Sequence, residues 1–110
     1  MGHQRIEARR LIMYCSETAK YKGKPLFDWL LQQALEMKMG GATAIKALSG
    51  FGQHQHLHHL HLIDLSCDLP VVVEVIDRQS RIDEYLETVT EALKNHTYIL
   101  EEVWWHQPQI

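Results

Sequence analysis

The stretch Val-Val-Val-Glu-Val-Ile at residues 71–76 constrains the fold more than any other part of the sequence. β-branched side chains favour strands because they pack well on a pleated surface. Pro70 and Asp77 flank the stretch, and both residue types are depleted inside strands. The sequence therefore predicts a strand at residues 71–76, and any fold of the chain has to pair this strand with others.

A second extended stretch, at residues 9–16, is apolar on both faces. Its alternating apolar side chains are Leu11, Ile12, Met13, Tyr14 and Cys15. A strand that is apolar on both sides is typical of the middle of a sheet. We therefore expect a central strand here, and we predict further extended stretches at residues 43–49, 60–65 and 98–105.

Two stretches show the apolar spacing of an amphipathic helix. The first begins at Pro25, a residue that suits the first turn of a helix. It ends before Gly40 and Gly41, since glycine readily adopts the left-handed conformation found at helix C-termini. Asp77 or Ser80 is placed to cap the second helix. The apolar stripes are Leu26, Leu30, Ala34 and Met37 in the first helix and Ile82, Tyr85, Leu86, Val89 and Leu93 in the second.

The main elements follow the order strand, helix, strand, strand, helix, strand. This is the order of the ferredoxin-like βαββαβ sandwich, an α+β fold in which two helices cover one face of an antiparallel sheet. The other face would still carry apolar side chains, among them Ile12, Tyr14 and Val72. Because an exposed apolar face on a small domain usually marks a contact with another chain, we expect an oligomer.

Length and charge limit the kinds of protein that this chain can be. Its 110 residues make one domain, which we assign to residues 9–105, between a flexible N-terminus at residues 1–8 and a tail at residues 106–110. The net charge of −3 argues against a nucleic-acid partner. No apolar run is long enough to insert into a membrane. The N-terminus lacks the apolar core of a secretory signal, so we expect a cytoplasmic protein.

Catalytic motifs are not apparent. None of the serines lies in a nucleophile elbow. Glu101 and Glu102 are predicted to point to opposite faces of a strand, which prevents them from sharing acid–base work. Trp104 and Trp105 fit packing at the end of the sheet or a subunit contact better than stacking on nucleic acid. We therefore expect a protein that is not an enzyme.

Two short motifs fit phosphate contacts as well as they fit ordinary surface loops. Lys20, Lys22 and Lys24 occupy alternate positions, and lysine acts as a mobile point charge toward a phosphate. A solvated loop has the same composition. The Gly-Phe-Gly motif at residues 50–52 lacks the third glycine and the following helix of a dinucleotide-binding fingerprint. It is either a plain turn or a source of backbone N–H donors.

Five of the eight histidines fall within eight positions, at His54, His56, His58, His59 and His61. In an extended chain the first three share a face, with alternate residues about 7 Å apart. Imidazole is a suitable ligand for Zn²⁺, Ni²⁺ and Cu²⁺, but no cysteine or carboxylate completes the set. The cluster is a metal site, a loop whose histidines become charged together near about pH 5–6, or a polar loop with one or two histidines on a ligand.

Four segments, taken together, resemble domain-of-unknown-function family 190 (UPF0166-type). They are Lys22-Gly23-Lys24-Pro25-Leu26, Gly41-Ala42-Thr43, Gly50-Phe51-Gly52, and Asp68-Leu69-Pro70-Val71-Val72-Val73-Glu74-Val75-Ile76-Asp77. Order and spacing agree from about residue 9 to about residue 104. That family is similar to the P-II signalling proteins.

The resemblance implies a P-II-like homotrimer that binds an adenine nucleotide (AMP, ADP or ATP) in the clefts between subunits. Residues 53–68 would then form a mobile loop that meets a partner such as a membrane transporter or channel. The implied function is therefore regulation or signalling. The alternative is a metal-binding or metal-tolerance module whose ligands are His54, His56 and His58.

The resemblance also implies which residues contact the nucleotide. A motif at the base of the mobile loop would lie beside the phosphates, and lysines from the first loop would pair with them. Arg78 or Arg81 would be further phosphate partners. The implied nucleotide-binding residues are Lys22, Lys24, Gly50, Phe51, Gly52, Gln53 and His58.

Overall fold

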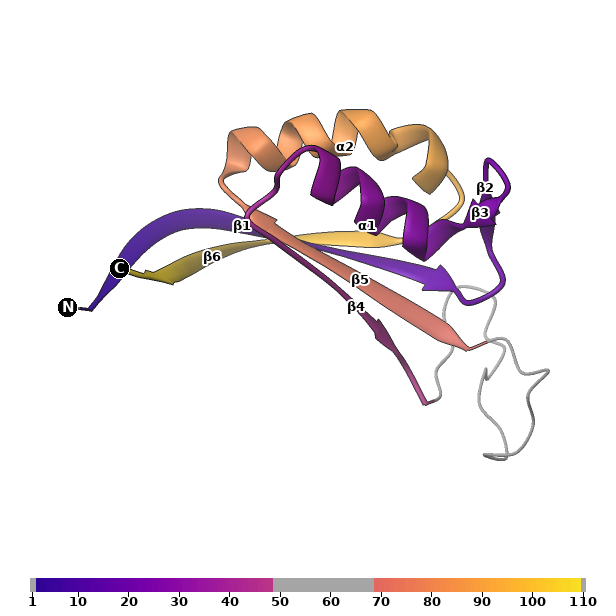
Figure 1. Ribbon diagram of the computed structural model, residues 1–110, viewed down its shortest axis with the longest axis horizontal. Helices are drawn as coiled ribbons and strands as arrows, with labels where there is room; N and C mark the ends of the chain where they lie inside the picture. Colours follow the sequence, from indigo (N-terminus) through magenta and orange to yellow (C-terminus); the bar gives the residue numbers. More distant parts are fainter. Residues whose placement is uncertain (1, 49–68, 110) are drawn as a thin grey trace.

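A computed structural model describes residues 2–48 and 69–109 of the chain (Figure 1). The extended stretch predicted at residues 60–65 lies outside these ranges. Neither helix in the described ranges is long and apolar enough to cross a membrane. The elements are β1 (His3–Ser16), β2 (Lys20–Tyr21), β3 (Lys24–Pro25), α1 (Leu26–Glu36), β4 (Gly41–Lys46), β5 (Pro70–Asp77), α2 (Gln79–Leu93) and β6 (Tyr98–Pro108).

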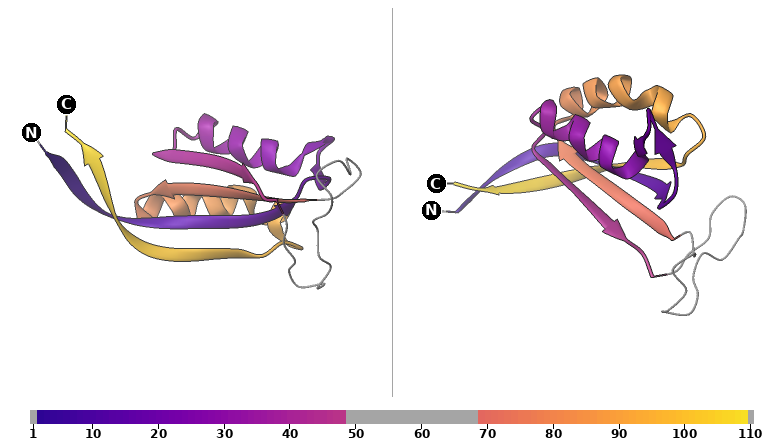
Figure 2. Two further views of the ribbon diagram at one scale, coloured as in Figure 1. Left: turned by 90° about the horizontal axis from the view of Figure 1, so that it is seen from below. Right: turned by 45° about the vertical axis from the view of Figure 1, so that its right-hand side comes forward.

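Four strands form one antiparallel sheet in the order β4–β5–β1–β6, and β2 and β3 form a separate hairpin. In the middle of the sheet, Leu11 of β1 lies opposite Val75 of β5 on one side and Leu100 of β6 on the other. Both helices cover the same face of the sheet (Figures 1 and 2). The predicted ferredoxin-like fold is confirmed, and β1 is the central strand that its two apolar faces predicted.

The core lies between the helices and the two middle strands. Every second residue of β5 is buried, and the buried residues of α2 recur at helical spacing. The buried Tyr85 hydroxyl donates a hydrogen bond of 2.7 Å to the carbonyl oxygen of Leu30, which satisfies a group that would be costly to bury alone. The fully buried side chains include Leu11, Met13, Leu26, Leu30, Val73, Val75, Ile82, Tyr85 and Val89.

A two-stranded ribbon extends beyond the four-stranded part of the sheet. β1 pairs with β6 from His3 onward, but with β5 only from Arg9 onward. Residues 3–8 and 103–108 therefore have only each other as strand partners among the described residues. Both chain termini lie at the tip of this ribbon (Figure 1). We call it the outer ribbon.

The outer ribbon corrects two sequence-based predictions. The flexible N-terminus expected at residues 1–8 is wrong for residues 3–8, and the tail expected at residues 106–110 belongs to β6 as far as Pro108. The physical reason is backbone pairing between the two ends of the chain, which a local sequence pattern does not reveal. Burial of Ile6 and Ala8 adds apolar contacts at the base of the ribbon.

Trp105 fixes the base of the outer ribbon against the start of β4. A methyl group added to Gly40 would lie 2.1 Å from Cη2 of Trp105 and 3.1 Å from the backbone oxygen of Ile76. Those distances leave no room for a side chain. Glycine is therefore required at position 40 because of packing against a strand from the other end of the chain.

The C-terminus of α1 is closed by Lys38, and the prediction that Gly40 and Gly41 end the helix through a left-handed glycine is wrong. Lys38 adopts a φ of +55°. Its N–H donates a hydrogen bond to the carbonyl oxygen of Leu35, and the N–H of Met39 donates one to the carbonyl oxygen of Ala34. Both N···O distances are 3.0 Å. This is the Schellman pattern.

Asp77 connects the start of β4 with the start of α2. Its buried carboxylate accepts hydrogen bonds from the N–H of Gly40 at 2.9 Å and the N–H of Arg78 at 2.6 Å. Arg78 is the N-cap residue of α2, and no side chain caps it. The prediction that Asp77 or Ser80 caps the helix is therefore wrong, because the Asp77 carboxylate bridges the two turns.

The face of the sheet opposite the helices combines apolar side chains with an ion cluster. Nε of Arg10 donates to Glu74 at 2.8 Å, and Nη1 donates to Glu101 at 2.6 Å. The hydrogen bond to Glu74 raises the pKa of Arg10, and the hydrogen bond to Glu101 adds to the effect. Tyr14 and Ile99 remain exposed. The oligomer expected from this face stays a prediction.

Candidate functional site

At one end of the sheet, backbone hydrogen bonds join the described residues that flank residues 49–68 to each other and to the turn between β1 and β2. The N–H of Ala47 donates to the carbonyl of Pro70 at 2.9 Å, and the N–H of Glu17 donates to the carbonyl of Leu69 at 2.8 Å. Glu17 belongs to the turn between β1 and β2. The β1–β2 turn and the adjoining ends of β4 and β5 are therefore fastened together by backbone hydrogen bonds.

The hairpin of β2 and β3 holds two lysines out in solvent at this end of the sheet. Lys22 and Gly23 form its turn with φ values of +52° and +79°, and positive φ at both positions is typical of a type I′ turn. The ring of Tyr21 lies 4.5 Å from the ring of Trp29 on α1. This contact anchors the hairpin, so Lys22 and Lys24 are exposed on a fixed support.

Together the hairpin and the end of β4 form a cationic surface, which we call the lysine end and define as Lys20, Lys22, Lys24 and Lys46. All four residues are exposed. Lys46 forms an ion pair with Glu17, whereas the other three have no ion-pair partner among the described residues. In a chain with a net charge of −3, this local excess of positive charge favours an anionic ligand.

The structure brings together part of the predicted nucleotide site. Lys22 and Lys24 lie at the lysine end, as a shared phosphate site requires. Lys46 was not identified from the sequence, although its position within the strand predicted at residues 43–49, four residues before the Gly-Phe-Gly motif, is a usable signal. The predicted residues that lie outside the described ranges are Gly50, Phe51, Gly52, Gln53 and His58.

Arg78 and Arg81 lie at the other end of the sheet, at the start of α2, so they do not join the lysine end (Figure 1). Nη1 of Arg81 is 2.9 Å from the Glu84 carboxylate, and Nη2 donates to the carbonyl oxygen of Met37. Within one chain neither arginine lies beside Lys22 and Lys24, because β5 and α2 place them at opposite ends of the sheet. Their role as phosphate partners in a cleft between subunits stays a prediction.

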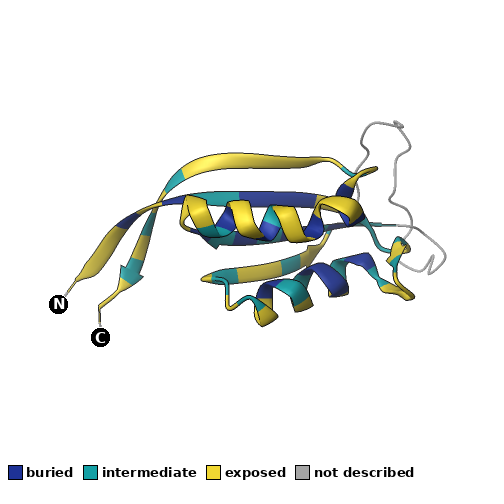
Figure 3. Cartoon of the chain, turned by 90° about the horizontal axis from the view of Figure 1, so that it is seen from above, coloured by how far each residue is buried: buried dark blue, intermediate teal, exposed yellow. Residues whose placement is uncertain are grey.

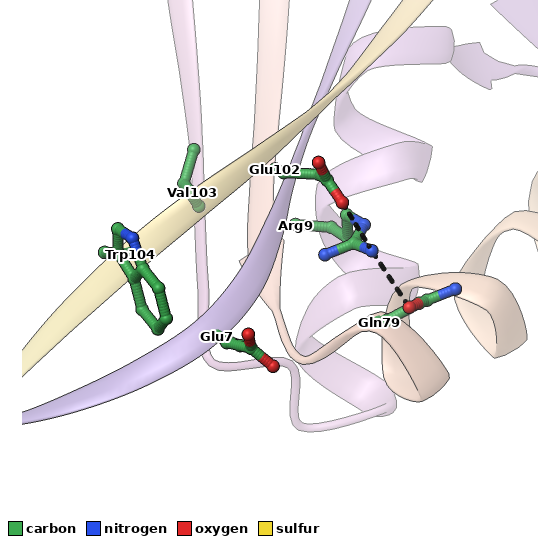
Figure 4. A pocket seen from close by; sticks show the side chains of 6 residues that line it. All are labelled: Glu7, Arg9, Gln79, Glu102, Val103 and Trp104. Atoms are coloured by element: carbon green, nitrogen blue, oxygen red, sulfur yellow. Dashed lines mark hydrogen bonds and ion pairs between the residues drawn. The ribbon is translucent and has the colours of Figure 1, made fainter.

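A hollow of about 460 Å³ lies between the outer ribbon and the start of α2 (Figure 4). Nη2 of Arg9 donates to Oε1 of Gln79 at 3.0 Å and lies 3.3 Å from Glu102. On the ribbon, the Arg5 guanidinium lies 3.8 Å from the centre of the Trp104 ring. The sequence did not predict this hollow, whose walls come from both ends of the chain and α2. Its lining residues are Glu7, Arg9, Gln79, Glu102, Val103 and Trp104.

The buried groups that could react are held in unreactive forms. Burial raises the pKa of the Cys15 thiol to about 12, and a thiol is a poor nucleophile until it loses its proton. Burial also raises the pKa of Tyr85, whose hydroxyl already serves a structural hydrogen bond. Neither group is placed to act as a nucleophile or a general base near neutral pH.

The proposed metal ligands His54, His56 and His58 lie outside the described ranges. Across residues 2–48 and 69–109, no three histidine, cysteine, aspartate or glutamate side chains are grouped so that they could hold a metal ion. The metal site therefore stays a prediction from the histidine spacing alone.

Sequence comparison identifies the family of the chain. The family model DUF190, described as "Uncharacterized ACR, COG1993", matches residues 8–104. A UPF0166 protein of Aquifex aeolicus (strain VF5) is 34% identical over 98 residues, which cover 89% of this chain and 92% of the relative.

Comparison with solved structures identifies the fold. CPII, a nitrogen regulatory PII-like protein from Thiomonas intermedia K12 solved with ADP, AMP and bicarbonate, superposes with a TM-score of 0.70 at 14% identity, over 96% of this chain and 93% of that one. A putative PII-like signaling protein from Thermus thermophilus gives a TM-score of 0.63 at 14% identity, over 92% and 91%. The chain thus has a PII-like fold, and it belongs to the DUF190 family.

Proposed function

We propose that this protein is a P-II-like regulator that binds an adenine nucleotide (AMP, ADP or ATP) with its phosphates at the lysine end. The observation that carries the proposal is the presence of exposed lysines, without ion-pair partners among the described residues, on a fixed hairpin at one end of the sheet. The fold is shared with CPII, whose structure contains ADP and AMP. A polyphosphate is the part of such a ligand that lysines bind best.

Within this proposal, Lys22 and Lys24 contact the phosphates. The support is their exposure on the hairpin next to the β1–β2 turn, which is hydrogen-bonded to Leu69, the first described residue after residues 49–68. Backbone N–H groups of the glycine motif would supply further donors to a phosphate. The remaining proposed contacts, predicted from the sequence, are Gly50, Phe51, Gly52, Gln53 and His58.

The proposed protein works by binding and not by catalysis, as a homotrimer in the cytoplasm. Its nucleotide lies in the cleft between subunits, and residues 53–68 contact a partner such as a membrane transporter or channel. The support for self-association is the exposed apolar side chains on the face of the sheet opposite the helices. The support for the partner contact is the family resemblance.

Calorimetric titration of ADP into the wild type and a Lys22→Gln/Lys24→Gln variant tests the proposal. Charge-assisted hydrogen bonds are each worth about 1.5–3 kcal/mol, so we expect each lysine to contribute a factor of at least about 10 and the double variant to bind ADP at least about 100-fold more weakly or not at all. Lys38→Gln is a matched control, because Lys38 shares the left-handed backbone of Lys22, with φ of +55° against +52°. It lies at the far end of α1.

The control variant is expected to keep the wild-type dissociation constant within about twofold. Titration with adenosine, which has no phosphate, measures the part of the affinity that does not depend on lysine. Absence of AMP, ADP and ATP binding to the wild type would overturn the proposal. Binding that is equally strong in the double variant would retain a nucleotide site but remove it from the lysine end.

A further inference from the structure

The two helices give one side of the molecule an acidic surface. α1 and α2 together contain six acidic residues and one basic residue, Arg81. Exposed residues run along the outer sides of both helices (Figure 3), and all six acidic residues are exposed. They are Asp28, Glu36, Asp83, Glu84, Glu87 and Glu91. A surface of this kind repels an anionic partner.

The lysine end has the opposite charge. Three of its four lysines occupy alternate positions on the hairpin, and none of these three has an ion-pair partner among the described residues. The acidic residues closest to them in the sequence are Glu17, which pairs with Lys46, and Asp28, in the first turn of α1. Positive charge is therefore in excess here, although the chain as a whole has a net charge of −3.

An exposed apolar side chain adjoins the lysine end. Leu48 is 81% exposed and follows Lys46 by two positions. The backbone just before it is held at this end of the sheet, because the N–H of Ala47 donates a hydrogen bond to the carbonyl oxygen of Pro70. Segments that bind to membrane surfaces combine lysine or arginine with large apolar side chains that enter the headgroup region. The lysine end together with Leu48 has this composition.

The separation of the two charged surfaces favours a flat anionic partner. α1 begins directly after the hairpin and extends away from it for 11 residues, about 16 Å (Figure 1). Glu36 at its far end therefore lies farther from a surface that touches the hairpin than the Debye length of about 8 Å at physiological salt. A bilayer can contact the lysine end and leave the acidic helices in solvent, whereas a long nucleic acid that followed the surface would meet them.

We propose that the lysine end is a docking surface for an anionic phospholipid bilayer, with its lysines paired to lipid phosphates. The inference rests on the partner part of the proposed function and deepens it. If residues 53–68 contact a membrane transporter or channel, the end of the sheet where the flanking residues are held faces the membrane. An anionic bilayer then adds its attraction for the lysines to the contact with the partner.

The same lysines connect lipid binding with nucleotide binding. The phosphates of ADP and the phosphates of the bilayer would both pair with Lys22 and Lys24, so the two ligands compete. A ligand that binds only the free protein draws it away from the membrane by mass action. Nucleotide binding therefore releases the protein from the bilayer.

Co-sedimentation of the full chain with phospholipid vesicles tests the docking surface. One set of vesicles contains equal parts of phosphatidylglycerol and phosphatidylcholine, and the other contains phosphatidylcholine alone. We expect the wild type to sediment with the anionic vesicles only. The Lys20→Gln/Lys22→Gln variant should bind them about 25-fold more weakly, because each lysine near an anionic surface strengthens binding about fivefold.

Lys38→Gln/Arg78→Gln is the matched control, because it removes the same charge from two exposed residues away from the lysine end. It should bind the anionic vesicles within about twofold of the wild type. Circular dichroism verifies that both double variants are folded. Saturating ADP should release the wild type from the vesicles, and adenosine, which has no phosphate, should not.

Four outcomes would overturn the docking surface. They are absence of binding to anionic vesicles, equal binding to vesicles of phosphatidylcholine alone, equal losses in the two double variants, and a DNA duplex that binds as tightly as the vesicles and loses binding in the same variant. Vesicle binding that persists in saturating ADP would overturn the competition. The vesicle assay needs no nucleotide or partner protein, and calorimetry with ADP needs no lipid, so failure of the docking surface can be told apart from failure of the proposed function.

Discussion

The two ends of the sheet both carry cations, but at one end most of the cations already have polar or acidic partners. At the lysine end, Lys22 and Lys24 are exposed and have no ion-pair partner in the described part of the chain. At the other end, Arg78 is exposed, whereas Arg9 is engaged by Gln79 and Glu102, and Arg81 by Glu84. An anion would have to disrupt these contacts at the second end, whereas at the first it would mainly displace water.

The difference shows that a hollow and a binding site are separate properties. The hollow beside Arg9 has a volume of about 460 Å³, yet its arginine is already engaged by Gln79 and Glu102. The lysine end offers positive charge that forms no ion pair with a described acidic residue, apart from the pairing of Lys46 with Glu17. For a phosphate ligand, cations without acidic partners favour the lysine end.

The largest effect on stability is expected at the ribbon end. Gly40→Ala places a methyl group 2.1 Å from the Trp105 ring, and such overpacking costs about 1–3 kcal/mol. Urea unfolding should show this loss, while ADP affinity stays unchanged. Gly41→Ala is the control, since no atom lies within 4 Å of its added methyl group. Equal stability of the two variants would show that Trp105 does not constrain position 40.

The core that joins the two ends is expected to lose stability at alkaline pH. Burial raises the pKa of Cys15 to about 12, so the folded chain keeps a proton that the unfolded chain loses above about pH 8.5. The contribution of Cys15 is full below about pH 8.5 and falls toward pH 12, by up to about 1.4 kcal/mol per pH unit.

Urea unfolding at pH 7.5, 9 and 10 measures this loss of stability. The Cys15→Ala variant should lose less stability over this pH range than the wild type. Burial also raises the pKa of Tyr85, so a smaller alkaline loss should persist in the variant above about pH 10. If the stability of the Cys15→Ala variant depends on pH as strongly as that of the wild type, the titrating group is not Cys15.

Salt should weaken ADP binding and leave adenosine binding unaffected. Because the lysines are exposed, their attraction for phosphates is screened as the Debye length falls from about 10 Å at 0.1 M to about 3 Å at 1 M. We expect a loss of several-fold in ADP affinity by calorimetry across this range. ADP and adenosine affinities that change in parallel would remove the lysines from the site.

The smallest effect concerns the ion pair of Lys46 with Glu17. Glu17→Gln should release Lys46 for a phosphate, and since surface ion pairs are worth about 0–1 kcal/mol, ADP should bind up to about fivefold more tightly. Glu84→Gln releases Arg81 at the other end of the sheet and should leave the affinity unchanged. Unchanged or weaker binding to Glu17→Gln would exclude Lys46 from the site.

Local patterns in the sequence predicted the fold because the core depends on them. The β-branched run of β5 and the stripes of both helices have periods that only one arrangement of layers can bury. The order of elements then leads to the ferredoxin-like sheet. Lys22 and Lys24 could be predicted to lie close together because they belong to one short loop, and their contact with phosphate stays a prediction.

The rest could not be predicted because it depends on contacts between distant parts of the chain. Residues 3–8 are mostly polar, and their strand partner lies at the opposite terminus. In the sequence Gly40 has the position of a helix-terminating glycine, whereas in the structure it is required by the close packing of Trp105. The sequence does not reveal that α2 places Arg81 at the far end of the sheet from Lys22 and Lys24 of the same chain. Long-range packing overrides local preference in each case.

Hydrogen–deuterium exchange on the full chain, with and without ADP, compares the two ends most directly. Ligand binding slows exchange where it suppresses local opening. We expect ADP to slow exchange in peptides that cover residues 17–26, with no change at the start of α2 or in the outer ribbon. Slower exchange at residues 78–84 and 103–108, with none at residues 17–26, would contradict the assignment of the phosphate site to the lysine end.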